Sequence, residues 1–127
     1  MEEALRAALL AASGVSALVA DRLDWGLRPA AVPSVRLQLV GKVPFYTYSG
    51  RDSLTPYRVQ ADCFGRRYGE AKLVARAIEV AVDALGRPEF DACFLLSERD
   101  DQDTDAAGQP LHRASLDFRI WHHTTQP

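Results

Sequence analysis

The stretch YRVQADCFGRRYGEAKLVARAIEVAVDAL, residues 57–85, changes its hydrophobic period part-way along. Over residues 57–64 apolar and polar side chains alternate, which is the period of a strand with one buried face. Over residues 68–85 apolar side chains recur every three or four positions, as on the buried side of an amphipathic helix. These apolar residues are Leu73, Val74, Ala77, Ile78, Ala81, Val82 and Leu85. Gly86 and Pro88 commonly follow a helix, so the stretch predicts a strand followed by a helix.

Further segments have the composition of strands. VRLQLV (35–40) and RASLDFRIW (113–121) alternate apolar and polar residues, and CFLLSER (93–99) is first apolar and then polar. The aromatic segment 42–56 contains prolines and a glycine, so we expect it to form a short strand that runs into a loop.

The N-terminal region predicts helices. Residues 2–12 form an Ala- and Leu-rich segment that begins with two Glu residues, and acidic side chains favour a helix N-terminus. Ser13 and Gly14 are expected to end this helix. A short second helix is expected over 15–23, and residues 25–34, which include two prolines, are predicted to form an extended connection.

The predicted fold class is α+β: a mainly antiparallel sheet buries one face under two helices, the 68–85 helix and the N-terminal helix. A chain of 127 residues fits one domain, so residues 1–127 are predicted to form a single domain. With 47% hydrophobic residues, 25% charged residues and a net charge of -2, the composition is that of an ordinary globular protein, and no membrane contact is expected. Cys63 and Cys93 have no metal-binding spacing and are expected to be free thiols.

Strand alternation places polar side chains on the sheet face that points away from the predicted helices. These residues are Arg36, Gln38, Arg58, Gln60, Asp62, Ser115, Asp117 and Arg119. Such a mixed-charge face is either solvated or an assembly contact, and we give these two interpretations equal weight.

The acidic stretch DDQDTDAAGQPLH, residues 100–112, resembles a calcium loop at first sight. An EF-hand counted from Asp101 needs Gly at its sixth position and Glu at its twelfth, but the residues there are Ala106 and His112. Turn-forming Asp, Gly and Pro residues without an apolar residue before Leu111 instead predict a long, solvated connection between two strands of a hairpin.

Catalytic motifs are few in this sequence. It contains no GxSxG, HExxH, P-loop or GxGxxG pattern, and neighbouring strand residues His122 and His123 are expected to point in opposite directions. The best enzyme alternative is a metal-assisted site built from Glu98, Asp100 and His112. No cofactor, metal site or catalytic residue is predicted, and the slightly acidic composition lacks the positive stripe of a nucleic-acid-binding surface.

Several pieces of the sequence, taken in order, resemble one family. The pieces are MEEALRAALLA, VADRLDWG with its proline-bearing link, YRVQADCFG, YGEAKLVARAIEVAVDAL, and FLLSERDD with HRASLDFRIWHH. Together they resemble the phage tail completion family, which comprises small tail-terminator or head-to-tail joining proteins of long-tailed phages and related gene transfer agents. The resemblance covers nearly the whole chain and includes no catalytic motif.

The resemblance implies a structural virion protein that forms a ring, typically a hexamer. Such a ring sits on the last ring of the tail-tube protein, terminates tail growth and joins the tail to a head connector or adaptor protein. DNA passes through the ring without specific binding. The implied location is the cytoplasm of a bacterial host during assembly and then the tail of the particle.

Contact residues are assigned from physical reasoning alone, because the family supplies no motif for them. The expected oligomer or partner interface is Arg36, Gln38, Arg58, Gln60, Asp62, Asp117 and Arg119. The expected lumen or docking loops contain Phe45, Tyr46, Tyr48, Asp100, Asp101, Asp103 and Asp105. Carboxylates that face the lumen repel the DNA backbone, and aromatic loop residues become ordered on docking. The alternative from another class is a small adaptor that binds a partner strand at a sheet edge.

Overall fold

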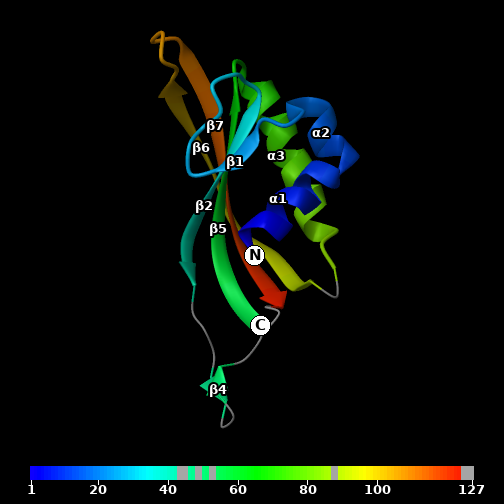
Figure 1. The fold of residues 1–127 in the computed structure, drawn as a ribbon. Coiled ribbons are helices and arrows are strands. Elements are labelled where there is room, and N and C mark those ends of the chain that lie inside the picture. Colours follow the sequence, from blue (N-terminus) through cyan, green and yellow to red (C-terminus); the bar gives the residue numbers. More distant parts are fainter. Residues whose placement is uncertain (43–45, 48–49, 52–53, 87–88, 124–127) are drawn as a thin grey trace.

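The computed structural model describes residues 1–42, 46–47, 50–51, 54–86 and 89–123 (Figure 1). In chain order the elements are α1 (Glu2–Ala11), α2 (Ser13–Val19), β1 (Leu23–Trp25), β2 (Ser34–Lys42), β3 (Tyr46–Thr47), β4 (Gly50–Arg51), β5 (Leu54–Gly65), α3 (Tyr68–Asp83), β6 (Phe90–Thr104) and β7 (Pro110–His123). The helices lie on one face of a five-stranded, mostly antiparallel sheet, so the predicted α+β class is confirmed. Within the described residues, no helix has the length and apolar character needed to cross a membrane.

The strand order in the sheet is β1-β2-β5-β7-β6. Only β1 and β2 pair in parallel; the other neighbours in this sheet are antiparallel. The central pair β5 and β7 stays in register from Leu54 opposite His123 to Gly65 opposite His112. The β6–β7 hairpin extends past the helices at one end of the molecule (Figure 1), so its tip is open to contact with other chains.

The N-terminal region differs from its prediction in two details. Ala12 has an extended backbone and separates α1 from α2, so Ser13 and Gly14, which were expected to end the first helix, lie inside the second. Leu23, expected to end the second helix, instead begins β1 and is fully buried. A strand of three residues is too short to show a hydrophobic period, which is why the sequence did not reveal it.

The core lies between the sheet and the helices. The alternation predicted for 113–121 is confirmed on this side, because its apolar members are buried against α3. The largest fully buried side chains of the protein include Leu5, Leu9, Leu23, Leu37, Ile78, Leu116, Phe118 and Ile120. Cys63 lies in this core, and both cysteines are free thiols as predicted.

Gly65 makes the turn from β5 into α3 possible. A Cβ atom at this position would lie 2.7 Å from the backbone nitrogen of Ala71, which is closer than real Cβ atoms approach. The helix therefore begins against the end of the strand and returns over the sheet, where its apolar stripe meets β5 and β7.

Candidate functional site

The sheet face turned away from the helices, here called the open face, is organised around a buried carboxylate. Asp62 on β5 is fully buried. Its Oδ2 accepts hydrogen bonds from Nε and Nη2 of Arg36 at 3.0 and 2.6 Å. Its Oδ1 accepts hydrogen bonds from Nε2 of Gln60 at 2.8 Å and from Oγ of Ser115 at 2.7 Å. Strands β2, β5 and β7 thus each contribute to one hydrogen-bonded network.

This network keeps Asp62 ionised. Burial by itself raises the pKa of the carboxyl group, but the hydrogen bonds from Gln60, Ser115 and Arg36 outweigh burial, so the pKa lies below its ordinary value of 3.8. Beside the network, the guanidinium group of Arg36 lies 5.5 Å from the ring centre of Phe64, and that of Arg28 lies at the same distance. These cation–π contacts help to cover this end of the open face.

A second carboxylate holds the neighbouring strand pair together. Oδ2 of Asp117 on β7 accepts hydrogen bonds from Oγ of Ser97 at 3.0 Å and from Nη1 of Arg99 at 3.2 Å, both on β6. Nη2 of Arg58 on β5 is 4.0 Å from the same oxygen. The side chain of Asp117 is only 7% exposed, so its charge interacts mainly with groups of its own chain.

The solvated interpretation of the open face is therefore wrong for Asp62, Ser115 and Asp117, which are all buried. The sequence predicted correctly that these residues share one face, but not that arginines on adjacent strands enclose the carboxylates. Of the predicted interface residues, Arg58 and Arg119 are exposed. Arg36, Gln38 and Gln60 are partly exposed, so the open face presents cations more than anions.

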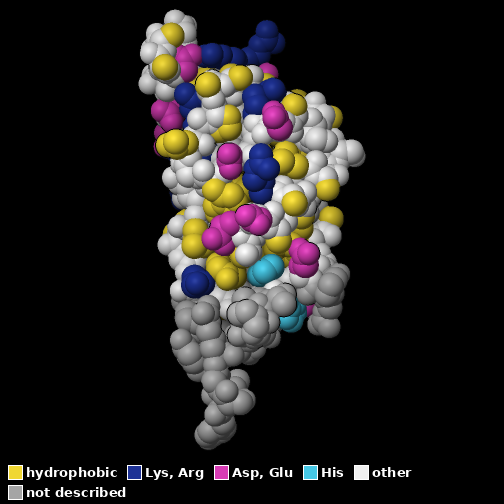
Figure 2. All heavy atoms as spheres, in the orientation of Figure 1, with side chains coloured by type: hydrophobic (Ala, Val, Ile, Leu, Met, Phe, Trp, Pro, Cys, Tyr) yellow, Lys and Arg dark blue, Asp and Glu magenta, His cyan; other side chains and the backbone are white. Residues whose placement is uncertain are grey.

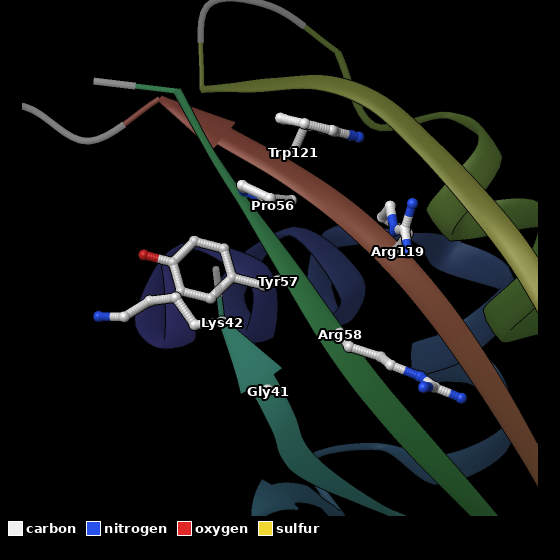
Figure 3. A pocket seen from close by; sticks show the side chains of 7 residues that line it. All are labelled: Gly41, Lys42, Pro56, Tyr57, Arg58, Arg119 and Trp121. Atoms are coloured by element: carbon white, nitrogen blue, oxygen red, sulfur yellow. The ribbon is translucent and has the colours of Figure 1, made fainter. Parts of the chain in front are cut away.

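The open face ends in a hollow of about 390 Å³ beside the end of β2 (Figure 3). It is lined by Gly41, Lys42, Pro56, Tyr57, Arg58, Arg119 and Trp121. Figure 3 shows Lys42 beside Tyr57, whose ring centre is 5.9 Å from Nζ of Lys42. No pattern in the sequence predicts a role for Lys42, which follows the 35–40 segment by two residues.

The acidic stretch is not the long solvated connection that its composition predicted. Residues 100–104 continue β6, and only residues 105–109 join β6 to β7. Asp101 pairs in register with Arg113 across the hairpin, and Nη2 of Arg113 lies 2.7 Å from Oδ2 of Asp101 and Nη1 3.8 Å from Oδ2 of Asp103. Opposite charges therefore face each other across the hairpin and stabilise the pairing of its two strands.

The remaining aspartates of this stretch also have partners. Asp105 accepts hydrogen bonds from the backbone N–H groups of Ala107 and Gln109, and its Oδ2 is 2.7 Å from Nη1 of Arg66. The hydrogen bond from the N–H of Gln109 and the one from Arg66 are the main reasons that the pKa of Asp105 is lowered. Lys and Arg side chains lie beside Asp and Glu side chains at this end of the molecule (Figure 2), so the hairpin tip carries paired charges.

The proposed metal-assisted enzyme receives no support from this geometry. Nζ of Lys72 on α3 bonds to both Glu98 and Asp100, and the hydroxyl of Tyr68 donates to Asp100 at 2.8 Å. Hydrogen bonds to Asp100 and Glu98 raise the pKa of Lys72, which keeps its ammonium group charged. His112 packs edge-on against the Tyr68 ring, with 6.1 Å between ring centres. Among the described residues, no three His, Cys, Asp or Glu side chains form a group able to hold a metal ion.

The predicted aromatic loop lies mostly outside what can be described. Phe45 and Tyr48 lie outside the described residues. Tyr46 belongs to β3, which pairs with β4 in a separate two-stranded ladder, and its register partner is Arg51. The proposal that these aromatics dock on a partner therefore stays a prediction.

A comparison with family models shows which family the chain belongs to. The model described as "Tail completion protein gp17" matches residues 3–123. This chain belongs to the tail completion protein gp17 family. The tail completion family has a structural role in phage tails, as the sequence resemblance implied, and the match includes the main sheet, α2, α3 and all of α1 except Glu2.

A solved structure has the same fold as this member of the tail completion family. It is a chain of a structure described as "Virion of native gene transfer agent (GTA) particle", with a TM-score of 0.61 and 18% sequence identity. The alignment covers 97% of this chain and 94% of that chain. Among curated proteins, none matches the sequence.

Proposed function

We propose that this tail completion protein is a single-domain subunit of a ring, hexameric by the resemblance to its family, that caps the tail tube. The ring stops tube growth and joins the tail to the head connector, and DNA passes through its centre without specific binding. The observation that carries this proposal is the family match over residues 3–123. A fold shared with a chain of a gene transfer agent virion supports it further.

The geometry supports two different roles for the predicted contact residues. Arg58 and Arg119 are exposed and project from the open face, so they are the residues proposed to touch another subunit. Asp62 and Asp117 have their carboxylates satisfied within the chain, so their proposed role is to hold the arginines of the open face in place.

The β6–β7 hairpin is the proposed contact with the tail-tube protein or the head connector. It projects past the helices (Figure 1), and its aspartates form ion pairs with Arg113 and Arg66. The proposed location is the bacterial host cytoplasm during assembly, followed by the tail of the finished particle. The proposed role is structural, without catalysis.

The test of the capping role uses particles made without this protein. We expect tails of uncontrolled length and heads without tails, and we expect added purified protein to restore joined particles, as counted by electron microscopy. A matched addition of protein with a disrupted core, Phe118→Asp, controls for non-specific effects, because Phe118 is fully buried. Normal tails and normal joining in the absence of the protein would contradict the proposal.

One observation favours the adaptor alternative. Strand β6 is at the edge of the five-stranded sheet, and its outer side pairs with no other described strand, so it could accept a partner strand. A protein that stays monomeric on tail tubes but binds one extended peptide along β6 would support the adaptor in place of the ring.

A further inference from the structure

Two arginines face each other across neighbouring strands of the open face. Arg58 on β5 and Arg119 on β7 are register partners, and like charges directly opposite each other destabilise a sheet. The nearest carboxylate, Asp117, lies 4.0 Å from Arg58 and already accepts hydrogen bonds from Ser97 and Arg99. Among the described residues, Arg119 has no acidic partner. The two guanidinium groups therefore keep donors available for carboxylates from outside the chain.

An exposed aromatic side chain extends this pair into a row. Phe94 on β6 is the register partner of Arg119 and is 54% exposed. In the next row Pro56 pairs with Trp121. Arginine and aromatic side chains are the types most enriched in the centres of protein interfaces. We call Arg58, Arg119 and Phe94 the cationic row.

The helical layer carries a surface of the opposite character. A hollow of about 480 Å³ opens between α1, the end of α3 and the start of β6. Its lining is mainly small and apolar, and consists of Ala8, Ala11, Ala12, Ala81, Ala84, Leu85, Gly86, Glu89 and Phe90. Glu89 is exposed here, and within the described part of the chain it has no basic partner. We call this surface the alanine hollow.

We propose that the cationic row of one subunit docks on the alanine hollow of a second copy of this chain. The ring of Phe94 fills the small apolar hollow, while Arg58 and Arg119 meet Glu89. Charge complementarity identifies the occupant: the open face presents Arg58, Arg99 and Arg119 although the whole chain has a net charge of -2, so the acidic excess lies elsewhere on the same chain.

The placement of the two surfaces gives the contact a direction. The helices cover one face of the sheet (Figure 1). The members of the cationic row alternate along their strands with residues that are buried in the core or packed against it, so the row lies on the other face and the two surfaces are on opposite sides of the subunit. A contact between two different patches is heterologous, and repeated copies of it close into a ring when the rotation allows. This inference rests on the proposed ring function and supplies the surfaces that would build the ring.

Charge reversal in the full chain tests the contact. Arg119→Glu or Glu89→Arg should each weaken self-association about 10- to 100-fold, because like charges then meet in the interface. The double variant Arg119→Glu/Glu89→Arg should restore it, as should an equimolar mixture of the two single variants. Arg67→Glu makes the same charge change at an exposed arginine outside both surfaces and should associate like the wild type. Sedimentation velocity would measure association over a concentration range, with the protein alone and on purified tail tubes, and circular dichroism would confirm folding.

The outcomes separate this inference from the ring proposal. If the wild type self-associates, or places several copies on one tube end, while both single variants do the same, the contact is wrong and the ring proposal stands. If the wild type does neither, both fall. If Arg119→Glu leaves self-association unchanged but weakens binding of the protein to DNA, the cationic row contacts nucleic acid and the inference is overturned.

Discussion

At the scale of single residues, Asp62 is the side chain on which most of the open face depends. It has no exposed surface, and its two oxygens accept four hydrogen bonds from Arg36, Gln60 and Ser115. Removal of the carboxylate would leave the half-buried guanidinium group of Arg36 and the buried hydroxyl of Ser115 without their partner. Such groups cost more when unpaired than the hydrogen bond itself contributes.

Asp62→Ala should lower the free energy of unfolding by about 2–3 kcal/mol, the range for loss of hydrogen bonds to a charged group. Urea denaturation followed by circular dichroism would measure this change. Gln38→Ala is the control, because Gln38 is on the same face and partly exposed, and it should change the urea midpoint little. Equal midpoints for wild type and Asp62→Ala would contradict the role assigned to the network.

The same residue predicts how stability depends on pH. Its folded pKa lies below the ordinary value of 3.8, so the ionised carboxylate stabilises the folded state above that value, and this contribution is lost as pH falls through the folded pKa. The difference in unfolding free energy between wild type and Asp62→Asn should therefore be constant near neutral pH and shrink below about pH 4. A difference that stayed the same down to the acid transition would contradict the lowered pKa.

At the scale of elements, the junction between β5 and α3 fixes how the helix lies on the sheet. Gly65 ends the strand, Tyr68 begins the helix, and there is no room for a side chain at the glycine. The hydrophobic periods of the sequence predicted both the strand and the helix. The short distance between Gly65 and Ala71 depends on the path of the chain in space, which no local pattern encodes.

Gly65→Ala should destabilise the protein by about 1–3 kcal/mol, because the added methyl group would push the backbone at Ala71. Gly69→Ala is the matched control: this glycine is in α3 with nothing within 4 Å of an added Cβ. The control should stabilise by up to about 1 kcal/mol through helix propensity. Thermal unfolding of both variants would measure the effects, and two changes of the same sign would contradict the tight junction.

At the scale of the whole molecule, different surfaces of the subunit carry different charges. The hairpin tip carries aspartates paired with arginines, the open face presents arginines, and the alanine hollow contains the exposed carboxylate of Glu89. A subunit with different charges on different sides can be placed in an assembly in one orientation, because opposite-sign contacts set register more than they add affinity. The proposed ring makes use of this polarity.

Asp101→Asn with Asp103→Asn should leave the urea midpoint nearly unchanged, because exposed ion pairs contribute little to stability. The double variant should nevertheless reduce the number of joined head–tail particles, since the tip would lose two negative charges and Arg113 would lose its ion-pair partners. Glu3→Gln with Asp21→Asn removes as many charges from exposed sites away from the hairpin and serves as control. Unchanged counts of joined particles and unchanged infection or transfer would contradict a docking role for the tip.

The sequence by itself determined the elements whose side chains repeat with a clear period. Alternation identified the strands around Val59 and Phe118, and three- and four-residue spacing identified α3. The same periods predicted the burial of Val74, Ile78 and Val82 correctly, but Leu73, predicted on the buried side of the helix, is 61% exposed. The order of these pieces also led to the family that the family model confirms. Such features depend on neighbours along the chain, so a local pattern is enough to reveal them.

Only the tertiary structure decided which charged side chains of the open face are buried and paired. The burial of Asp62, the pairing of Asp101 with Arg113 and the facing of Arg58 toward Arg119 all depend on strand register. Register joins residues far apart in the sequence, and a shift of one residue turns every side chain to the other face. For this reason the sequence placed these charges on strands, but it could not show which of them are paired within the chain and which are left for a partner.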